Sequence, residues 1–402
     1  MRITKFVIPE IIFGVDSLGQ AGSSLTRLGA HRVFLATDPG VREAGWVDKV
    51  LPHLEEFGIE WVIWDDVSEN PKDAEVRRGA ELYRRESCDS ILAVGGGSPM
   101  DAAKGVGILV THGGRISDYA GVDLVTRPLP PMVMIPSTAG TGADVSQFAV
   151  ITDTERRVKL VLCSKSLVPD ISITDPLLLT SKDAELTAYT GMDALTHAIE
   201  SYVSIAATPL TDVHALSAIE LIAQNLRASV GSRDNLTAKV NMAMASLKAG
   251  ICLSNAALGA THAITHQIGG MLDVAHGTAN AVVLPHIMEY NLIADTERYA
   301  RIARAMGEKV DDLSTRDAAL RSVAAVRDLA RDVGLPVVVA EAKRLPVDCV
   351  PGMVEGALDD VCLVTNPRDL GEAELGELFR AVLSLPAEDL RQDPLHSSDG
   401  LA

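Results

Sequence analysis

Three histidines lie close together in one nearly uncharged stretch, HAITHQIGGMLDVAHG, at residues 262 to 277. Imidazole rings bind metals and move protons near neutral pH. His262 and His266 are four residues apart, and on a helix that spacing places both on one face, about one turn apart. His276 follows Gly269 and Gly270, and a turn at these glycines is expected to fold it back onto the same cavity. The spacing alone leaves His262 and His266 equally eligible as ligands.

A second pair repeats this spacing with a carboxylate. Asp193 and His197 lie four residues apart in GMDALTHAIE, residues 191 to 200. One such pair is common on helices, but the chain has only ten histidines and four of them fall in these two segments. One carboxylate oxygen and three imidazole nitrogens are donor atoms that suit Fe(II) and also the borderline-soft Zn(II). The combination therefore predicts a divalent-metal site.

A glycine-rich turn is a candidate site for a second bound group, in addition to the metal. The stretch ILAVGGGSPMDAAK, residues 91 to 104, predicts a buried strand, three glycines and then a helix, with Ser98 at its N-cap and Pro99 opening it. Exposed N–H groups and the helix dipole make such a turn an anion site that fits a pyrophosphate. A tight turn without a ligand explains the pattern equally well. The GxGxxG fingerprint of the common dinucleotide fold is absent, so the nucleotide fold is a different one or there is none.

Two other strand ends carry suitable chemistry. Asp38 ends the predicted strand VFLATD, where a carboxylate accepts hydrogen bonds from a ribose diol and repels the 2′-phosphate of NADP; it also suits a cap at Pro39. The stretch PSTAGTGAD, residues 136 to 144, opens from a strand into hydroxyls and glycines. Ligands of open α/β sheets bind where strands end. Three such strand ends together favour a nucleotide site.

The elements that must position these residues fall into two groups. Short β-branched runs alternate with helical patterns up to about residue 180, with strands expected at residues 32–38, 61–67, 91–97 and 132–137. After that point Ala- and Leu-rich segments with helical periodicity replace them. We therefore expect an α/β domain at residues 1–180 and an all-helical domain at 181–402, with the boundary near Ser181. The tail from about residue 386 is expected to be loosely ordered.

Composition excludes several classes of function. The chain has 402 residues and a formal net charge of −18, which disfavours nucleic acids and anionic membranes. Its five cysteines are scattered, with no CxxC pair, so a reducing compartment is expected. The first residues lack the apolar core of a signal peptide, and no uncharged apolar run approaches the roughly 18 residues that span a bilayer. These features predict a cytoplasmic protein.

Five stretches together resemble the iron-containing (group III) alcohol dehydrogenases: GGGSPMDAAK, PSTAGTGAD, GMDALTHAIESYVS, the segment from His262 to His276, and TANAVVLPHIMEYN. The likeness runs in matching order from about residue 5 to 385. It implies the dehydroquinate-synthase-like fold: a mostly parallel nucleotide-binding sheet with helices on both faces, then an all-α domain, with the active site in the cleft between them. It also implies NAD, a metal, and a homo-oligomer of two or more chains.

The resemblance also assigns roles to individual residues. It implies that Asp193, His197, His262 and His276 hold the metal, while His266 lies beside the nicotinamide as a proton relay. The implied cofactor contacts are Asp38 at the adenosine ribose, Asn70, Gly96, Gly97, Ser98 and Asp101 around the pyrophosphate, Ser137, Thr138 and Thr141 in the hydroxyl-rich loop and, less distinctively, Lys159 and Leu179.

The segment around the histidines also bears on the substrate. Residues 249 to 297 contain no Lys or Arg, so this part of the chain offers nothing to grip a phosphate or carboxylate. Phe148 replaces an Asn found in some relatives and Leu253 replaces a bulkier aromatic, while Cys362 matches a pocket-lining position. A small primary alcohol and its aldehyde are the expected substrates, and a polyol fits less well.

Three alternatives remain at this level. A lyase resembling dehydroquinate synthase shares the fold but grips a phosphorylated acid with several basic residues. An enzyme resembling maleylacetate reductase works without a metal, which leaves the Asp and His set unexplained. A structural metal-binding protein leaves the three strand-end loops unexplained.

Overall fold

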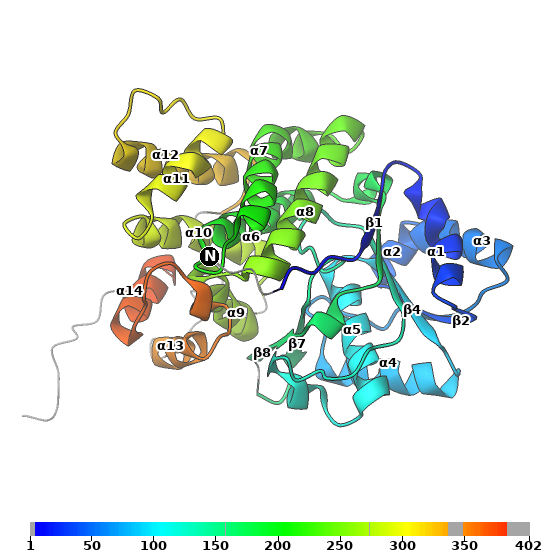
Figure 1. The fold of residues 1–402 in the computed structure, drawn as a ribbon. Coiled ribbons are helices and arrows are strands. Elements are labelled where there is room, and N and C mark those ends of the chain that lie inside the picture. Colours follow the sequence, from blue (N-terminus) through cyan, green and yellow to red (C-terminus); the bar gives the residue numbers. More distant parts are fainter. Residues whose placement is uncertain (1–4, 157, 273, 337–348, 384–402) are drawn as a thin grey trace, which may run out of the picture.

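The computed structural model describes residues 5–156, 158–272, 274–336 and 349–383. The predicted loose tail from about residue 386 lies outside these residues. Figure 1 shows the α/β half and the helical half side by side along the long dimension of the molecule.

A six-stranded parallel sheet forms the centre of the α/β half. Its strands, in spatial order, are β1 (Glu10–Phe13), β9 (Ile171–Thr174), β6 (Met132–Pro136), β4 (Ser90–Gly95), β2 (Arg32–Ala36) and β3 (Glu60–Trp64). Every pairing is parallel, with Phe34 opposite Ile91 and Ile91 opposite Met132. The predicted parallel sheet, and each of its four predicted strands, is confirmed.

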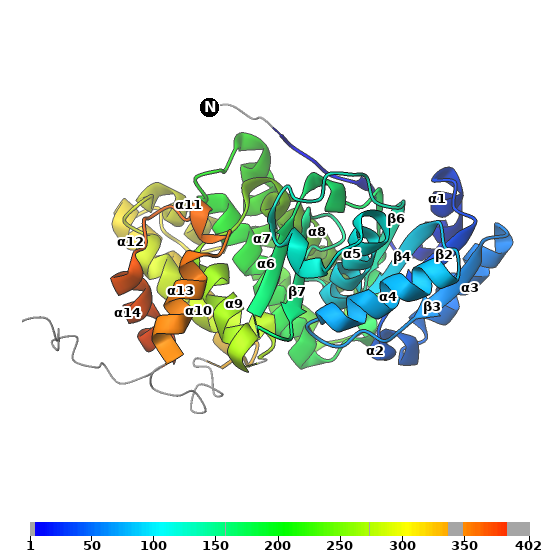
Figure 2. The same cartoon turned by 90° about the horizontal axis from the view of Figure 1, so that it is seen from below.

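Helices cover both faces of this sheet. The helices are α1 (Ala21–Arg27), α2 (Pro39–Glu43), α3 (Trp46–Glu56), α4 (Asp73–Arg85) and α5 (Gly97–His112). Successive residues of β2 point to opposite sides: Val33 packs in one buried cluster with α1 and α3, and Phe34 packs in another with α4 and α5. Strands that are buried on both faces appear in a sequence as continuous apolar runs, which is why these strands could be recognised. Figure 2 shows these layers from below.

The strand order places two of the candidate loops next to each other. From β2 the chain moves outward to β3, whereas from the neighbouring β4 it moves in the opposite direction to β6. Adjacent strands whose connections diverge leave a crevice at their carboxyl ends, and open α/β sheets bind ligands there. Asp38 follows β2, and the glycines at 95 to 97 follow β4. Both loops therefore open into one crevice.

A second, smaller sheet flanks the first. It contains β5 (Gly121–Val122), β8 (Val158–Cys163) and β7 (Phe148–Asp153), and β7 and β8 pair antiparallel. The sequence analysis did not predict this sheet. Its side chains include Phe148 and Lys159, which reach the candidate site.

Helices alone make up the described part of the chain after the 3-10 helix η4 (Pro176–Ser181). They are α6 (Ala184–Val203), α7 (Pro209–Gly231), α8 (Leu236–Ala256), α9 (Ala260–Leu272), α10 (His276–Asn291), α11 (Thr296–Ala305), α12 (Thr315–Asp332), α13 (Val350–Leu358) and α14 (Glu372–Leu383). The predicted change to an all-helical region is confirmed for the described residues. No helix among them is long and apolar enough to cross a membrane.

Close backbone contact joins the two halves. Gly142, in the loop after β6, has a φ of +61°, and a Cβ built on it would lie 2.4 Å from the Cα of Gly250 in α8. Only glycine tolerates both the left-handed backbone and this approach. The loop PSTAGTGAD is therefore fixed against the helical half by its own glycine.

Candidate active site

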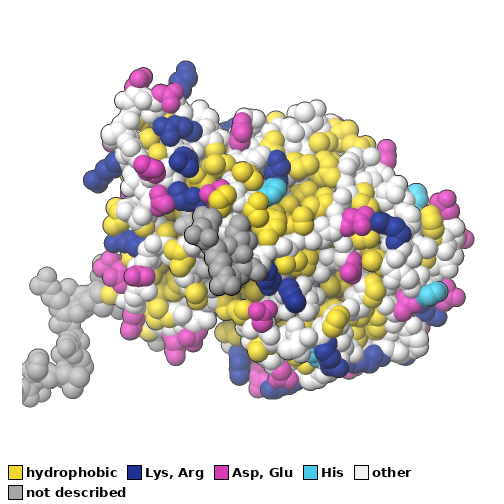
Figure 3. All heavy atoms as spheres, viewed as in Figure 1, with side chains coloured by type: hydrophobic (Ala, Val, Ile, Leu, Met, Phe, Trp, Pro, Cys, Tyr) yellow, Lys and Arg dark blue, Asp and Glu magenta, His cyan; other side chains and the backbone are white. Residues whose placement is uncertain are grey.

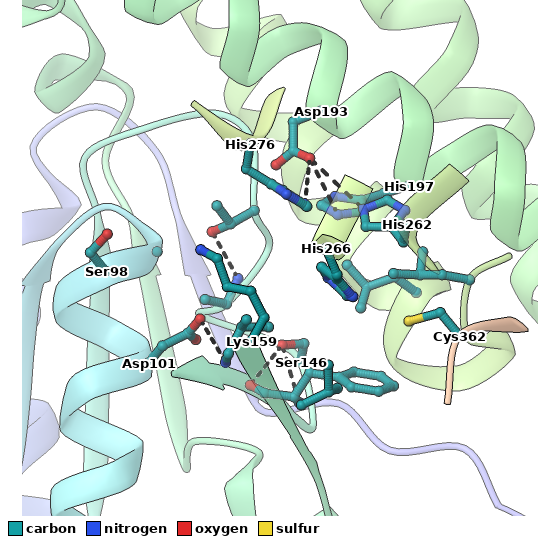
Figure 4. A pocket seen from close by; sticks show the side chains of 18 of the residues that line it. Ser98, Asp101, Ser146, Lys159, Asp193, His197, His262, His266, His276 and Cys362 are labelled. Atoms are coloured by element: carbon teal, nitrogen blue, oxygen red, sulfur yellow. Dashed lines mark hydrogen bonds and ion pairs between the residues drawn. The ribbon is translucent and has the colours of Figure 1, made fainter. Parts of the chain in front are cut away.

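Four side chains converge where the two halves meet. Asp193 and His197 lie one turn apart on α6, His262 lies on α9, and His276 is the first residue of α10. The Oδ1 atom of Asp193 is 3.6 Å from Nε2 of His197, 3.8 Å from Nε2 of His276 and 4.0 Å from Nε2 of His262. Figure 4 shows the three imidazoles pointing toward this carboxylate.

This geometry fits a divalent cation. Ligands about 2.1 Å from a tetrahedral metal lie about 3.4 Å from one another, close to the distances around Asp193. Burial holds the pKa values of His262 and His276 well below the usual range, so both rings are neutral and keep a lone pair for a metal. Burial also raises the pKa of Asp193, which shows that a carboxylate here needs a positive partner. One oxygen and three nitrogens suit Fe(II) or Zn(II).

A glycine allows His276 to join the other three side chains. A Cβ built on Gly277 would lie 2.1 Å from the carbonyl oxygen of Tyr189 on α6. Any other residue at this position would push α10 away from α6. The glycine after His276 therefore allows that imidazole to approach Asp193.

The route of the chain to His276 differs from the prediction. The expected turn at Gly269 and Gly270 is wrong, because α9 continues through both glycines to Leu272. Helix-interior glycines cost about 1 kcal/mol each relative to alanine, and the packing of α9 outweighs this cost. Gly269 faces the side chain of Lys159, whose Cε would lie 3.7 Å from an added Cβ. The chain instead turns back after α9, just before His276.

Two residues that the sequence analysis missed support the cluster. Glu200 lies three residues after His197 on α6, and its Oε2 is 2.5 Å from Nδ1 of His262, while Oε1 accepts a hydrogen bond from the Thr261 N–H. A carboxylate at Nδ1 leaves Nε2 of the same ring free for a metal. Burial raises the pKa of Glu200 to about 7. Asn280 Nδ2 donates to Asp193 Oδ1 over 2.8 Å.

His266 lies beside this cluster. Its ring stacks on that of His276 with centroids 5.5 Å apart, and its Nδ1 is 2.7 Å from Oδ2 of Asp360, another residue that the sequence analysis missed. With Nδ1 engaged by a carboxylate, Nε2 is the nitrogen available to the adjoining pocket. Its role as a proton relay stays a prediction.

An apolar pocket of about 150 Å³ adjoins the cluster. Its apolar wall includes Phe148, Val150, Val161, Leu253, Leu258 and Cys362. The polar side chains of its lining include Asp101, Ser146 and Lys159. A basic group therefore does reach this pocket, although the histidine-bearing segment has none, because Lys159 comes from β8 of the α/β half. Burial raises the pKa of the Asp101 carboxyl to about 6.

A groove of about 620 Å³ opens from the same place. Of the predicted cofactor residues, Asp38, Asn70, Gly96, Gly97, Ser98, Ser137, Thr138 and Thr141 line it. Asp101 and Lys159 line the apolar pocket instead, and Leu179 is buried and lines neither. The groove and the pocket share Asn70, Gly97, Ser98, Thr141, Asp193 and His276, so they form one continuous space.

The glycine turn differs in detail from the prediction. Gly96, not Ser98, is the N-cap of α5, and the helix begins at Gly97. A Cβ built on Gly97 would lie 2.7 Å from Cγ2 of Thr141, so the approach of the hydroxyl-rich loop by itself requires a glycine there. Ser98 therefore lies in the first turn of α5, where backbone N–H groups have no partner within the helix. Ser98 also lines the groove. The predicted cap is therefore wrong by two residues, while the anion site at this turn stays a prediction.

Asp38 has one of the two roles considered for it, the helix cap, and its contact with a ribose stays a prediction. The strand β2 ends at Ala36, and Asp38 is the N-cap of α2, where Oδ1 accepts from the Val41 N–H over 2.9 Å. The carboxylate still lines the groove. Lys182 is the only Lys or Arg among the described residues of that lining. Burial lowers the pKa of Lys182, and the charges of Asp38 and Asp183 partly oppose this lowering. The sequence analysis missed Lys182.

Comparison with known proteins identifies the family. The model of the iron-containing alcohol dehydrogenases matches residues 9–176, and the model of the C-terminal domain of the same family matches residues 187–383. The chain therefore belongs to the iron-containing alcohol dehydrogenase family, and it is an oxidoreductase. The predicted family and function are confirmed over the lyase, metal-free and structural alternatives. Membership implies the use of a metal and NAD(H).

Individual relatives are similar over nearly their whole length. A 1,3-propanediol dehydrogenase of Citrobacter freundii is 47% identical, over 94% of this chain and 98% of the relative. An NAD-dependent methanol dehydrogenase of Bacillus methanolicus is 37% identical, over 94% of this chain and 99% of its own length. A crystal structure of a 1,3-propanediol oxidoreductase superposes with a TM-score of 0.91 at 47% identity, covering 95% of this chain and all of the other. These likenesses confirm the predicted fold class.

Proposed function

We propose that this chain interconverts a small primary alcohol and its aldehyde, with NAD in the groove and Fe(II), or alternatively Zn(II), held by Asp193, His197, His262 and His276. The observation that supports the proposal most strongly is the convergence of four ligand atoms at the junction of groove and pocket. At this junction one set of side chains faces both the groove proposed for the nicotinamide and the pocket proposed for the substrate. Asp193 and His276 line both spaces.

The bound groups supply the reactivity that side chains lack. A divalent metal supplies Lewis acidity that lowers the pKa of an alcohol hydroxyl. A nicotinamide supplies the acceptor for hydride. The chain itself orients these groups: Glu200 fixes the His262 ring through Nδ1, and Asn280 holds the Asp193 carboxylate. Nε2 of His266 is placed to take up the proton that leaves the alcohol.

The groove favours NAD over NADP in this proposal. The Asp38 carboxylate accepts hydrogen bonds from the ribose diol, and its charge repels a 2′-phosphate. Asn70, Gly96, Gly97, Ser98 and Asp101 belong to the pyrophosphate end, Ser137, Thr138 and Thr141 to the hydroxyl-rich loop, and Lys159 and Leu179 to the remaining cofactor contacts. Support comes from the groove lining for Asp38, Asn70, the two glycines and the hydroxyl residues.

The pocket limits the substrate to a short chain. Its volume of about 150 Å³ and its wall of Phe148, Leu253 and Leu258 suit one to four carbons. A second candidate is 1,3-propanediol, because Ser146 and Lys159 offer polar partners for a distal hydroxyl. The name of the Citrobacter freundii relative, which is 47% identical, supports the diol.

Three further features belong to the proposal. Residues 1–180 form the cofactor-binding domain and residues 181–402 form the metal-binding domain. In support of this division, η4 ends at Ser181 and α6 begins at Ala184.

The chain forms a homo-oligomer. In support of this, hydrophobic side chains gather in the middle of the face in Figure 3, and Ile8, just before β1, is 47% exposed. The cytoplasm is its location.

The proposed function is tested by anaerobic purification, elemental analysis, and assays of NAD and NADP reduction with primary alcohols of one to four carbons, 1,3-propanediol and a hydroxy acid. We expect one equivalent of iron or zinc per chain, reduction of NAD with the alcohols, and none with the hydroxy acid. Turnover of the metal-free protein at the full rate, or turnover with NADP alone, contradicts the proposal.

A further inference from the structure

Among the residues that the structure describes, the Asp360 carboxylate is the one hydrogen-bond partner of the His266 ring. Asp360 lies two residues past the end of α13, 94 positions away from His266 in the sequence, and its Oδ2 is 2.7 Å from Nδ1. The two side chains are 5% and 4% exposed. The other carboxylate oxygen, Oδ1, accepts from the Cys362 N–H over 2.8 Å. Both oxygens are thus held, one by the backbone and one by the imidazole.

The carboxylate is an anion where burial alone favours a neutral acid. Burial acts to raise the pKa of Asp360, but the charge and hydrogen bond of His266 and the hydrogen bonds of Cys362 lower it to about 2. Burying an ionised carboxylate costs several kcal/mol unless it is paired. A partner that only satisfied the imidazole N–H could be a neutral carbonyl. A buried anion at this position does more, because it orients the ring and fixes which nitrogen carries the hydrogen.

The same residues do not form a second metal site as they stand. Ligand atoms of His266, Asp360 and Cys362 lie within 4.8 Å of one another. At 2.7 Å, however, Nδ1 and Oδ2 are already at hydrogen-bond distance, which leaves no room for an ion between them. The Cys362 thiol is buried, which raises its pKa well above the usual value, so it does not supply a thiolate. The geometry is that of a carboxylate and imidazole pair.

We propose that Asp360 is a positioning residue, which holds His266 as the Nδ1–H tautomer and presents Nε2 to the pocket between the metal cluster and Phe148. The ring stacks against His276 at an interplanar angle of 15°, and a free ring could rotate away from this orientation. The residues just after α13 thereby complete a site whose other parts lie on α6, α9 and α10. This inference rests on the proposed function, because it assigns work to the proton-carrying nitrogen of His266.

The test compares Asp360→Asn with a matched neighbour. Asparagine keeps the shape of the side chain, but its amide N–H group can donate to Nδ1 of His266. The hydrogen of the imidazole ring then moves to Nε2. We expect kcat to fall roughly 10- to 100-fold, with KM for NAD and metal content unchanged. Asp359→Asn, at an exposed position one residue earlier, should behave as wild type. Asp360→Glu keeps an acceptor and should retain most of kcat.

A double variant separates positioning from mere structural support. In a His266→Phe background, Asp360→Asn should cause no further loss of kcat, because the group it acts through is gone. An equal loss in both backgrounds overturns the proposal, and so does an unchanged kcat in Asp360→Asn. Equal losses in Asp360→Asn and Asp360→Glu also overturn it. Wild type is assayed first: absence of NAD-linked alcohol oxidation there refutes the proposed function instead.

Discussion

The two halves of this site are built by different means. The α/β half offers strand ends, glycines and hydroxyls, so the groove consists largely of backbone and small side chains. The helical half offers imidazoles and carboxylates from α6, α9 and α10, buried and held by second carboxylates or amides. The first half leaves space for a ligand that carries its own charges. The helical half brings buried carboxylates together beside the imidazoles, and a cation is needed to balance their charge. The helical half should therefore tolerate substitution far less than the α/β half.

The largest effect is expected in the helical half. His262→Ala removes one of the four proposed ligands and leaves Glu200 without its imidazole partner, so we expect loss of the metal and of all turnover above background. His266→Ala should keep the metal, lower kcat at least as much as Asp360→Asn does, and alter the pH profile. Elemental analysis and steady-state kinetics of both purified variants check this. Loss of metal from His266→Ala with retention in His262→Ala reverses the assignment of ligands.

A smaller effect is expected from a change that touches no ligand. Gly277→Ala places a methyl group against the Tyr189 carbonyl and shifts α10, so His276 moves and metal affinity should fall roughly 10- to 100-fold. Gly231→Ala, at the end of α7 with nothing within 4 Å of the added Cβ, is the control. Competition with a chelator measures both. Equal affinities would show that the approach of α10 to α6 does not set the site.

The α/β half should respond in specificity and keep its fold. Asp38→Asn retains a cap for the Val41 N–H but removes the charge. We expect kcat/KM for NADP to rise roughly tenfold, with a thermal unfolding midpoint like that of wild type. Kinetics with both cofactors check this. An unchanged NADP preference would mean that Asp38 acts only as a helix cap.

The smallest effect concerns Lys182, the one Lys or Arg among the described residues of the groove lining. Lys182→Met removes a cation that can balance phosphate charge, so the Kd for NAD should rise about two- to fivefold, and more at low salt. Lys165→Met, at an exposed position outside the groove, controls for net charge. Calorimetric titration measures both. No difference between the two variants would exclude a direct role for Lys182.

Periodic features could be predicted from the sequence. The four central strands were visible because both faces are buried, and Asp193 and His197 were visible because one helical turn brings them together. The antiparallel pair of β7 and β8 was not predicted because the connection between them contains no glycine or other typical hairpin signal. Glu200 could have been found, since it lies seven residues after Asp193 on the same face of α6.

Long-range partners could not be predicted. Asp360 meets His266 across 94 residues, and Lys182 lines the groove from the short connection between η4 and α6. The cap of α5 was misplaced because three successive glycines carry no side-chain signal for where a helix begins. The turn before His276 was misplaced because helix packing overrides the cost of two glycines. In each case tertiary contacts decide among local alternatives.

Anomalous diffraction from iron-loaded crystals tests the central claim most directly. We expect one peak at the iron edge, about 2.1 Å from Oδ1 of Asp193 and from Nε2 of His197, His262 and His276, in a protein that oxidises alcohols. A peak between His266, Asp360 and Cys362, or none at the cluster in an active enzyme, would contradict the account.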